Sequence, residues 1–196
     1  MLNAMTKRPA LIPAPDADLC LAFADTRYWR GTATPTDELQ EAEDLLRWAE
    51  KAERLPAGLV KRFDGSAALL SDAIGVRETI HRCFAATAAG HEPDEADLAT
   101  LNAALAQAPP RRLVRPGGWE VEAPEPLVSL LMAPVLWSAA DLLVGRQLPR
   151  VRQCANPACG WLFLDDSKSG NRRWCSMSAC GNRAKAHRHY QRQKAG

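Results

Sequence analysis

Four cysteines near the end of the chain have the type and spacing that bind a metal ion. They form two pairs with four residues inside each pair, Cys154 with Cys159 and Cys175 with Cys180, and fifteen residues separate the pairs. Four thiolates satisfy the tetrahedral coordination of structural zinc and leave no open position for a substrate. We therefore expect one structural Zn2+ ion at these cysteines, in preference to a chance clustering of four thiols.

The residues between and after the cysteines predict a small folded unit. Residues 160–164 have the pattern of a strand, residues 165–171 the composition of a turn, and residues 172–174 the pattern of a second strand. A helix is expected to begin at Cys180. This order of knuckle, hairpin and helix is like that of a treble-clef zinc finger.

The helix expected after Cys180 is strongly basic. Residues 150–196 contain ten Lys or Arg and two Asp or Glu, a net charge of +8, whereas the preceding residues carry −6. This asymmetry indicates an acidic partner for the finger, with DNA as the first choice. The side chains expected to contact phosphates or bases are Arg172, Arg173, Asn182, Arg183, Lys185, His187, Arg188 and Arg192. The alternatives are a solvated terminal helix, a helix cap at Asn182, and an acidic protein surface as partner.

The chain before the finger has the pattern of a mostly helical domain. Four segments show helical periodicity: 34–56, 66–89, 93–109 and 125–143. Thr34 and Pro35 are expected as the N-cap and first position of the first helix. Residues 111–124 predict a β-hairpin, and residues 18–25 predict a short strand or a buried segment.

Composition changes sharply after Leu148 and Pro149, which predicts a domain boundary there. We expect a flexible arm at 1–15, a helical domain at 16–148 and a zinc finger at 149–196, giving a mainly α chain of the α+β class. The most apolar stretch, 127–144, contains Pro134 and Asp141, which favour a core helix over a membrane span. No signal peptide is visible, so we expect a cytoplasmic protein with reduced thiols.

A polar and aromatic cluster follows the first apolar segment of the chain. Together with Trp48 or Trp137 it could bind a small ligand in the helical domain. The residues that would contact such a ligand are Asp25, Thr26, Arg27 and Trp29. The alternative, which we favour, is ordinary packing with an ion pair between Asp25 and a neighbouring arginine.

The remaining reactive side chains do not form a recognisable catalytic group. Cys20 and Cys83 lie in apolar surroundings, and His81, two residues before Cys83 on a helix, faces another direction. We expect both cysteines to be buried and inert. Because no nucleophile elbow, P-loop or HExxH motif occurs either, we expect the protein not to be an enzyme.

The end of the chain resembles the CGNR zinc-finger family, which is named for the segment present here at residues 180–183. The match includes both cysteine pairs, the GWLFLD strand, the RRWC segment and the NRAKA helix start. The body resembles the ABATE domain in LCLAFADTR, LNAALA and LLMAPVLWSAADLL. Similar sequences often read LDFVNT where this chain reads LAFADT, so Asp25 replaces an Asn with a charged residue.

The resemblance implies a bacterial, stress-induced transcription regulator with a zinc-dependent DNA-binding end and a body that senses a ligand or dimerises. One small finger buries too little surface to read a DNA site tightly, so a homodimer is expected, with the hairpin around Trp119 as a contact. Two other hypotheses stay open: a zinc-stabilised protein-interaction module, and a small-molecule sensor in the helical body.

Overall fold

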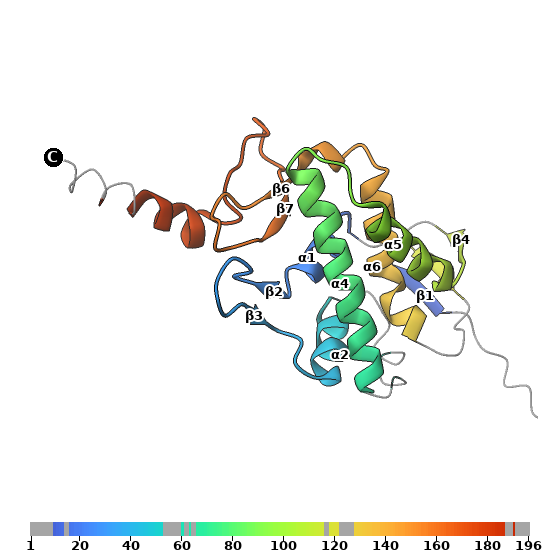
Figure 1. Cartoon of the computed structure of the whole chain (residues 1–196). Coiled ribbons are helices and arrows are strands. Elements are labelled where there is room, and N and C mark those ends of the chain that lie inside the picture. The colour runs from blue at the N-terminus through green and yellow to red at the C-terminus, as the bar shows by residue number, and fades with distance from the viewer. Residues whose placement is uncertain are drawn as a thin grey trace, which may run out of the picture.

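The computed structural model shows a helical body with small antiparallel sheets, followed by a C-terminal finger that contains a further two-stranded sheet (Figure 1). The residues it describes are 10–13, 16–52, 60, 63, 66–115, 118–121, 128–186 and 190. The four C-terminal cysteines lie together in the finger. The prediction of a mainly α chain with a four-cysteine finger is therefore confirmed.

Helix α4 (Ala67–Ala88) is the longest element and crosses the whole body. The hydroxyl of Ser66 caps it by accepting from the backbone N–H of Leu69 at 3.2 Å. The helix ends before Gly90, whose φ of 81° suits the left-handed turn that follows it. The predicted helix at 66–89 is confirmed with its cap and its terminator.

Helix α6 (Val128–Leu143) fills the centre of the core and packs against α1 (Leu19–Ala24), α4 and α5 (Glu95–Gln107). Nearly every described side chain in its middle is buried, including Leu130, Val135 and Trp137. Pro134 lies within the helix, as expected. Among the described residues, no helix combines the length and apolar character that crossing a membrane requires.

Helix α1 (Leu19–Ala24) occupies the segment expected to be a strand or a buried stretch. It lies between α4 and α6, and five of its six residues are buried. A short run that is apolar on every side has no periodicity that separates helix from strand. The strand alternative was therefore wrong, because contacts on both sides selected the helix.

Helix α2 (Ala42–Lys51) begins later than the sequence predicted. Its N-terminus is a capping box in which Glu41 and Asp44 exchange side-chain-to-backbone hydrogen bonds. Residues Thr36–Asp37 form strand β3 instead, paired with β2 (Arg27–Tyr28). The predicted cap at Thr34 and Pro35 was wrong because Thr36–Asp37 pair with β2. The Asp44 carboxylate accepts from the N–H groups of Gln40 and Glu41 at the actual start of the helix.

The predicted hairpin forms from β4 (Arg111–Arg115) and β5 (Gly118–Val121), and β1 (Ala10–Pro13) adds to the other edge of β5. The prediction of a loose arm was therefore wrong for residues 10–13, where Ile12 pairs with Trp119 and is fully buried. Residues 1–9, 14 and 15 lie outside the described part. Trp119, the expected dimer contact, belongs to the central strand and packs under the guanidinium of Arg111 at 4.9 Å.

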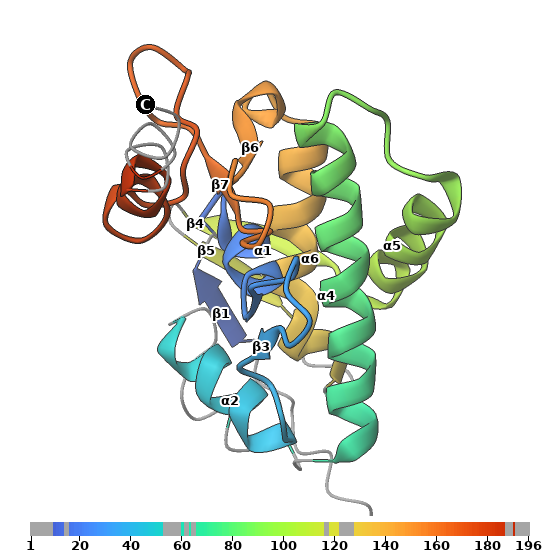
Figure 2. The same ribbon diagram turned by 60° about the vertical axis from the view of Figure 1, so that its left-hand side comes forward.

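The finger begins with a short 3-10 turn, η1 (Leu148–Arg150), followed by β6 (Val151–Gln153), which pairs with β7 (Leu162–Leu164). The expected second strand at 172–174 was wrong, since residues 171–174 have no strand partner. Figure 2 shows β6 and β7 next to α1 and α4. Val151, Leu162 and Leu164 belong to the same apolar core as the body, so this core continues across the predicted boundary at Leu148 and Pro149.

Candidate metal centre and its basic surroundings

The four cysteine sulfurs of the finger converge on one point. All four Sγ atoms lie within 4.8 Å of one another, and Cys175 Sγ is 3.8 Å from the Sγ atoms of both Cys159 and Cys180. A tetrahedral zinc ion with Zn–S bonds of about 2.3 Å separates its sulfurs by about 3.8 Å. A disulfide would need about 2.05 Å. The spacing therefore fits a metal ion and not a disulfide bond.

Each pair of cysteines is held by its own local structure. Cys154 directly follows β6, and its N–H donates to the carbonyl of Trp161 at 2.8 Å, which closes the knuckle. Cys175 precedes a π-helical turn, Met177–Gly181, that carries Cys180. The hydroxyl of Ser176 caps this turn. The two β-strands therefore fix the first pair, and a capped turn fixes the second.

The thiol environment disfavours ionisation in the absence of a cation. Burial and the nearby Cys154 raise the pKa of Cys159 to about 12. Burial and Cys159 likewise raise the pKa of Cys175. Burial opposes ionisation of Cys180 as well, but hydrogen bonds from the Asn156 amide and the neighbouring thiols lower its pKa. Four thiolates at this spacing need a bound cation, and binding that cation releases protons.

Asp165 holds the long segment that connects the two cysteine pairs. Its side chain is fully buried and accepts from the N–H and hydroxyl of Ser167 and from the N–H of Arg172. Its backbone carbonyl also accepts from Arg150 Nε at 2.8 Å. The Ser167 hydroxyl and the two backbone donors lower the pKa of Asp165. Sequence reasoning treated this residue only as part of a polar turn.

Backbone and side-chain hydrogen bonds attach the finger to the body. The N–H groups of Arg30 and Gly31 donate to the carbonyls of Cys159 and Ala158 at 3.2 and 3.3 Å. His81 Nε2 on α4 lies 3.0 Å from the carbonyl oxygen of Gly160, which places an N–H at that atom. The knuckle is therefore bound directly by the segment after α1 and by α4.

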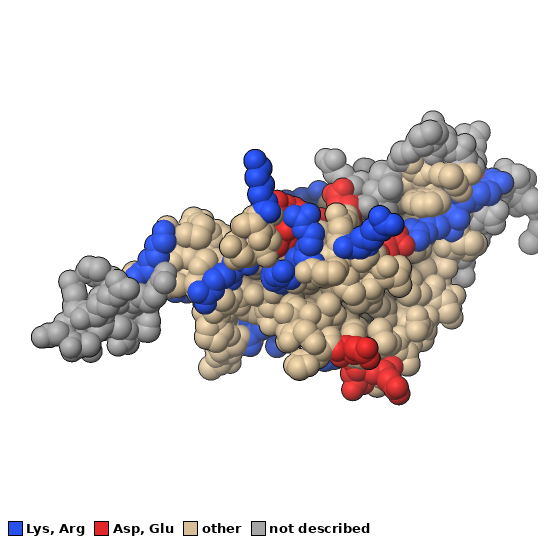
Figure 3. Space-filling view, turned by 90° about the horizontal axis from the view of Figure 1, so that it is seen from above, with Lys and Arg blue, Asp and Glu red and all other residues tan. Residues whose placement is uncertain are grey.

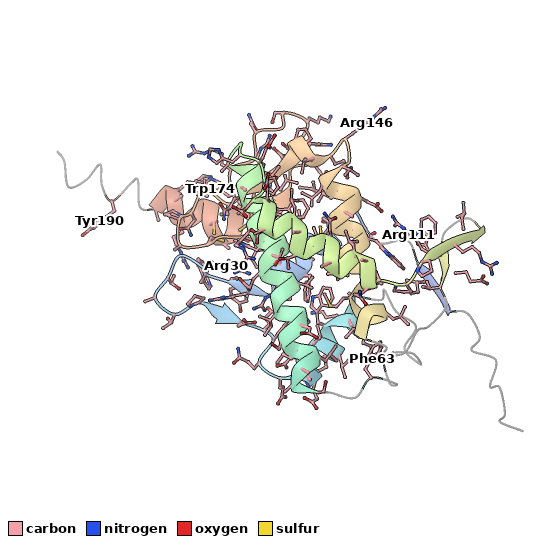
Figure 4. The ribbon with its side chains drawn as sticks, turned by 45° about the vertical axis from the view of Figure 1, so that its right-hand side comes forward. Arg30, Phe63, Arg111, Arg146, Trp174 and Tyr190 are labelled. Carbon is pink, nitrogen blue, oxygen red and sulfur yellow. The ribbon has the colours of Figure 1, made fainter. Side chains whose placement is uncertain are left out.

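Charged side chains surround this attachment. The Arg30 guanidinium lies beside α4 (Figure 4) and bonds the Glu78 carboxylate at 2.6 Å and the Ala24 carbonyl at 2.9 Å. Arg77 is fully buried and forms two hydrogen bonds to Asp37, at 2.6 and 2.5 Å. Both arginines hold elements of the body together. The sequence indicated Arg30 only as a member of the polar and aromatic cluster, and no sequence motif indicated Arg77.

Two family models match the chain, and they divide it between body and finger. The first, ABATE, described as "Putative stress-induced transcription regulator", matches residues 17–146. This chain belongs to the ABATE family. The CGNR zinc-finger model matches residues 150–193 and contains the four clustered cysteines. No curated protein matches the chain.

Both resemblances seen in the sequence are confirmed by these matches. With the sulfur geometry they establish a CGNR finger that holds one structural zinc ion at Cys154, Cys159, Cys175 and Cys180. A zinc ion in this site cross-links the two cysteine pairs, and its four cysteine ligands leave no open coordination position.

The residues predicted to contact a ligand are spread over the junction between the ABATE body and the finger. Asp25 and Thr26 are buried, and Asp25 Oδ1 accepts from the N–H of Leu162 on β7 at 3.0 Å. Arg27 and Arg30 both pair with Glu78, at 3.5 and 2.6 Å. Among the described residues, neither forms the expected ion pair with Asp25. Asp25 and Thr26 line one cavity together with Trp48, whereas Trp29 lines a different cavity beside the cysteines.

Five of the predicted nucleic-acid contacts fall in the described part, and all five are exposed: Arg172, Arg173, Asn182, Arg183 and Lys185. Arg172 also braces the metal loop, because its guanidinium donates to the carbonyls of Trp174 and Cys175. It packs over the Phe163 ring at 4.5 Å. Ser176, and not Asn182, caps the turn that leads into the helix.

Residues 182–186 continue the π-turn as an α-helix and carry three of these exposed contacts, Asn182, Arg183 and Lys185. The Arg183 guanidinium lies 4.8 Å from the centre of the Trp29 ring, so the body positions this cation on the finger. Trp29 has a φ of 55°, which is unusual for a bulky residue. His187, Arg188 and Arg192 lie outside the described residues.

The two body cysteines are buried in the ABATE core. Burial raises the pKa of Cys20 to about 12 and that of Cys83 to about 11. His81, the base nearest to Cys83 in sequence, contacts the finger backbone instead. The environment therefore disfavours a reactive thiolate at either position.

Proposed function

We propose that this ABATE protein is a DNA-binding transcription regulator whose CGNR finger contacts the DNA. The observation that carries the proposal is the set of exposed cations on a zinc-braced element: Arg173, Arg183 and Lys185. Arg183 packs on Trp29 of the body, and Arg173 packs on Trp174 next to the ligand Cys175, which limits the freedom of both cations. Fixed cations can neutralise phosphates at a lower entropic cost than cations on a mobile tail.

The shape of the molecule supports a contact at the finger. The helix after the π-turn extends away from the ABATE body (Figure 1), which leaves room for an extended partner. Figure 3 shows Lys and Arg side chains spread over the face seen from above and a separate group of Asp and Glu at one edge. A zinc ion with four thiolates carries about −2, which leaves residues 150–196 at about +6.

The test is selection from random-sequence DNA by the zinc-loaded full-length protein at two salt concentrations. Arg183→Ala with Lys185→Ala should abolish enrichment and reduce the salt slope by about one for each lost phosphate contact. Arg47→Ala, which removes an exposed body cation paired with Asp44, is the matched control and should behave as wild type. Absence of any binding at low salt would overturn the proposal.

A zinc-stabilised protein-interaction module is the second candidate function. The exposed thioether of Met177 next to the finger helix favours it, because an apolar group adds little to phosphate binding. Binding of DNA should weaken steeply between low and moderate salt, whereas binding of a protein partner held by apolar packing should not.

We further propose that the protein is not an enzyme, that it is cytoplasmic, and that it acts as a homodimer in which the ABATE body is the site of dimerisation.

A further inference from the structure

A cavity of about 350 Å3 opens where the ABATE body meets the finger. Its wall combines α1, the segments before and after α1, the end of helix α2 and Trp161, the residue before β7. It lies apart from the thiol cluster, since none of the four cysteines lines it. The cavity is therefore a separate site whose wall includes the finger residue Trp161.

A buried carboxylate forms part of this cavity wall. Asp25 is 4% exposed, and its Oδ1 atom accepts from the Leu162 N–H at 3.0 Å. Within the described part of the chain, its Oδ2 atom has no hydrogen-bond or ion-pair partner. The nearby Arg30 guanidinium is already bonded to Glu78 and to the Ala24 carbonyl. The wall thus presents one carboxylate oxygen that the fold leaves for another donor.

The rest of the lining is aromatic and acidic. Trp48 and Trp161, both half-buried, provide apolar surface on two sides of the cavity. Among the described lining residues, three exposed carboxylates, those of Asp16, Asp18 and Glu38, stand against one ammonium group, that of Lys51. The potential of these described groups attracts cations and repels anions.

We propose that this cavity binds a small organic cation, an alkyl- or arylammonium ion, whose charged group donates to Asp25 Oδ2 and whose apolar part lies against Trp48 and Trp161. A charge-assisted hydrogen bond to a desolvated carboxylate is among the strongest polar contacts available in a protein. Indole faces also attract cations and cover hydrocarbon. A neutral apolar molecule would leave Asp25 without its partner.

Occupation of the cavity would affect the finger through Asp25. Asp25 bonds the β7 backbone with one carboxylate oxygen and would bond the cation with the other. Burial raises the pKa of Asp25 to about 8, so a bound cation favours the ionised form and strengthens the bond to the Leu162 N–H. This binding does not depend on DNA, so it can fail or hold independently of the proposed function.

The test compares 2-phenylethylammonium with its near-isostere 2-phenylethanol, using the zinc-loaded full-length protein at moderate salt. Calorimetry should show saturable binding of the ammonium ion at least tenfold tighter than that of the alcohol. Hydrogen exchange of the Leu162 amide should slow in the presence of the ammonium ion. Equal affinity for the alcohol, tighter binding of Ca2+, or no binding of the ammonium ion at 10 mM would each overturn the proposal.

Asp25→Asn keeps an oxygen for the Leu162 N–H and removes the charge, so it should weaken ammonium binding at least tenfold. Glu38→Gln, at the exposed rim, should weaken it two- to threefold with no effect on folding. Asp72→Asn, which removes an exposed carboxylate of α4 outside the cavity, is the control and should bind as wild type. Unchanged binding in the Asp25 variant would refute the assigned site.

Discussion

Buried apolar side chains surround α1, α4 and α6 in the ABATE body, whereas the four thiols of the CGNR finger are packed with one buried aromatic residue, Phe163. Three partly exposed tryptophans, Trp29, Trp161 and Trp174, cover the rest of the cysteine cluster. Burial of these apolar side chains therefore drives folding of the body. The finger beyond β7 lacks that driving force and depends on its metal ion.

The two regions nevertheless meet at a seam, formed by β6, β7 and the body residues that contact them, which contains both apolar core residues and metal-binding residues. Strands β6 and β7 contribute Val151, Leu162 and Leu164 to the body core, while the knuckle between these strands binds metal. Polar groups with long sequence separations fix the seam, such as Asp25 with Leu162 and His81 with Gly160. Metal binding and body folding are thus connected through one small sheet.

Removal of zinc should have the largest effect and tests how separate the two regions are. Structural zinc contributes about 10–16 kcal/mol in isolated finger peptides. Chelation should therefore expose the backbone amides of residues 165–186 to fast hydrogen exchange while α4 and α6 stay protected. Cys154→Ser should have the same result, whereas Cys83→Ala should still bind one equivalent of zinc. Simultaneous loss of protection in α6 would show one cooperative unit.

Substitution of Arg77 tests how much a buried ion pair of the body contributes to the free energy of unfolding. Arg77→Met leaves Asp37 without its guanidinium partner and should lower the free energy of unfolding by about 3–5 kcal/mol. Arg82→Met removes an ion pair with Asp97 whose arginine side chain is 55% exposed, and should cost below about 1 kcal/mol. Urea unfolding measures both, and equal losses would contradict the distinction between buried and exposed pairs.

A methyl group added at Gly31, where the body contacts the knuckle, should lower the free energy of unfolding by an intermediate amount. The Cβ of Gly31→Ala would collide with the backbone carbonyl of Pro157, which cannot rotate away. We expect a loss of about 1–3 kcal/mol, together with faster release of zinc to a chelator. Gly75→Ala, in the interior of α4 with open space around it, should instead stabilise by about 0.5–1 kcal/mol. Thermal unfolding of both variants gives the comparison.

The smallest expected effect is the change that Asp25 causes in the free energy of unfolding over one unit of pH. Because burial raises its pKa to about 8, the folded protein keeps a proton that the unfolded chain has released above about pH 4. The free energy of unfolding should therefore fall as the pH rises toward 8, by at most about 1.4 kcal/mol per unit.

Asp25→Asn should remove this decline, and the variant should be more stable than wild type near pH 8. The difference between the two unfolding curves at pH 6, 7 and 8 isolates Asp25, because other groups such as His81 contribute to both. Parallel curves would show that the carboxylate is ionised in the folded protein throughout this range.

Local signals in the sequence predicted the elements that depend on neighbouring residues. Ser66 and Gly90 marked the ends of α4, and the hairpin of β4 and β5 followed from its turn residues. The prediction failed where tertiary contacts selected between local alternatives. Residues 10–13 became a strand because β5 offered an edge, and Leu19–Ala24 became a helix because both of its sides are covered.

The sequence by itself determined the metal site, because four cysteines at fixed spacing leave few coordination chemistries available. It also determined the charge asymmetry and the helical body, which depend on composition and periodicity. Only the tertiary structure decided the placement of Asp25, Trp29 and His81 at the seam. Their partners lie more than seventy residues away, and no local pattern encodes contacts at such separations, since these form only when the core brings distant segments together.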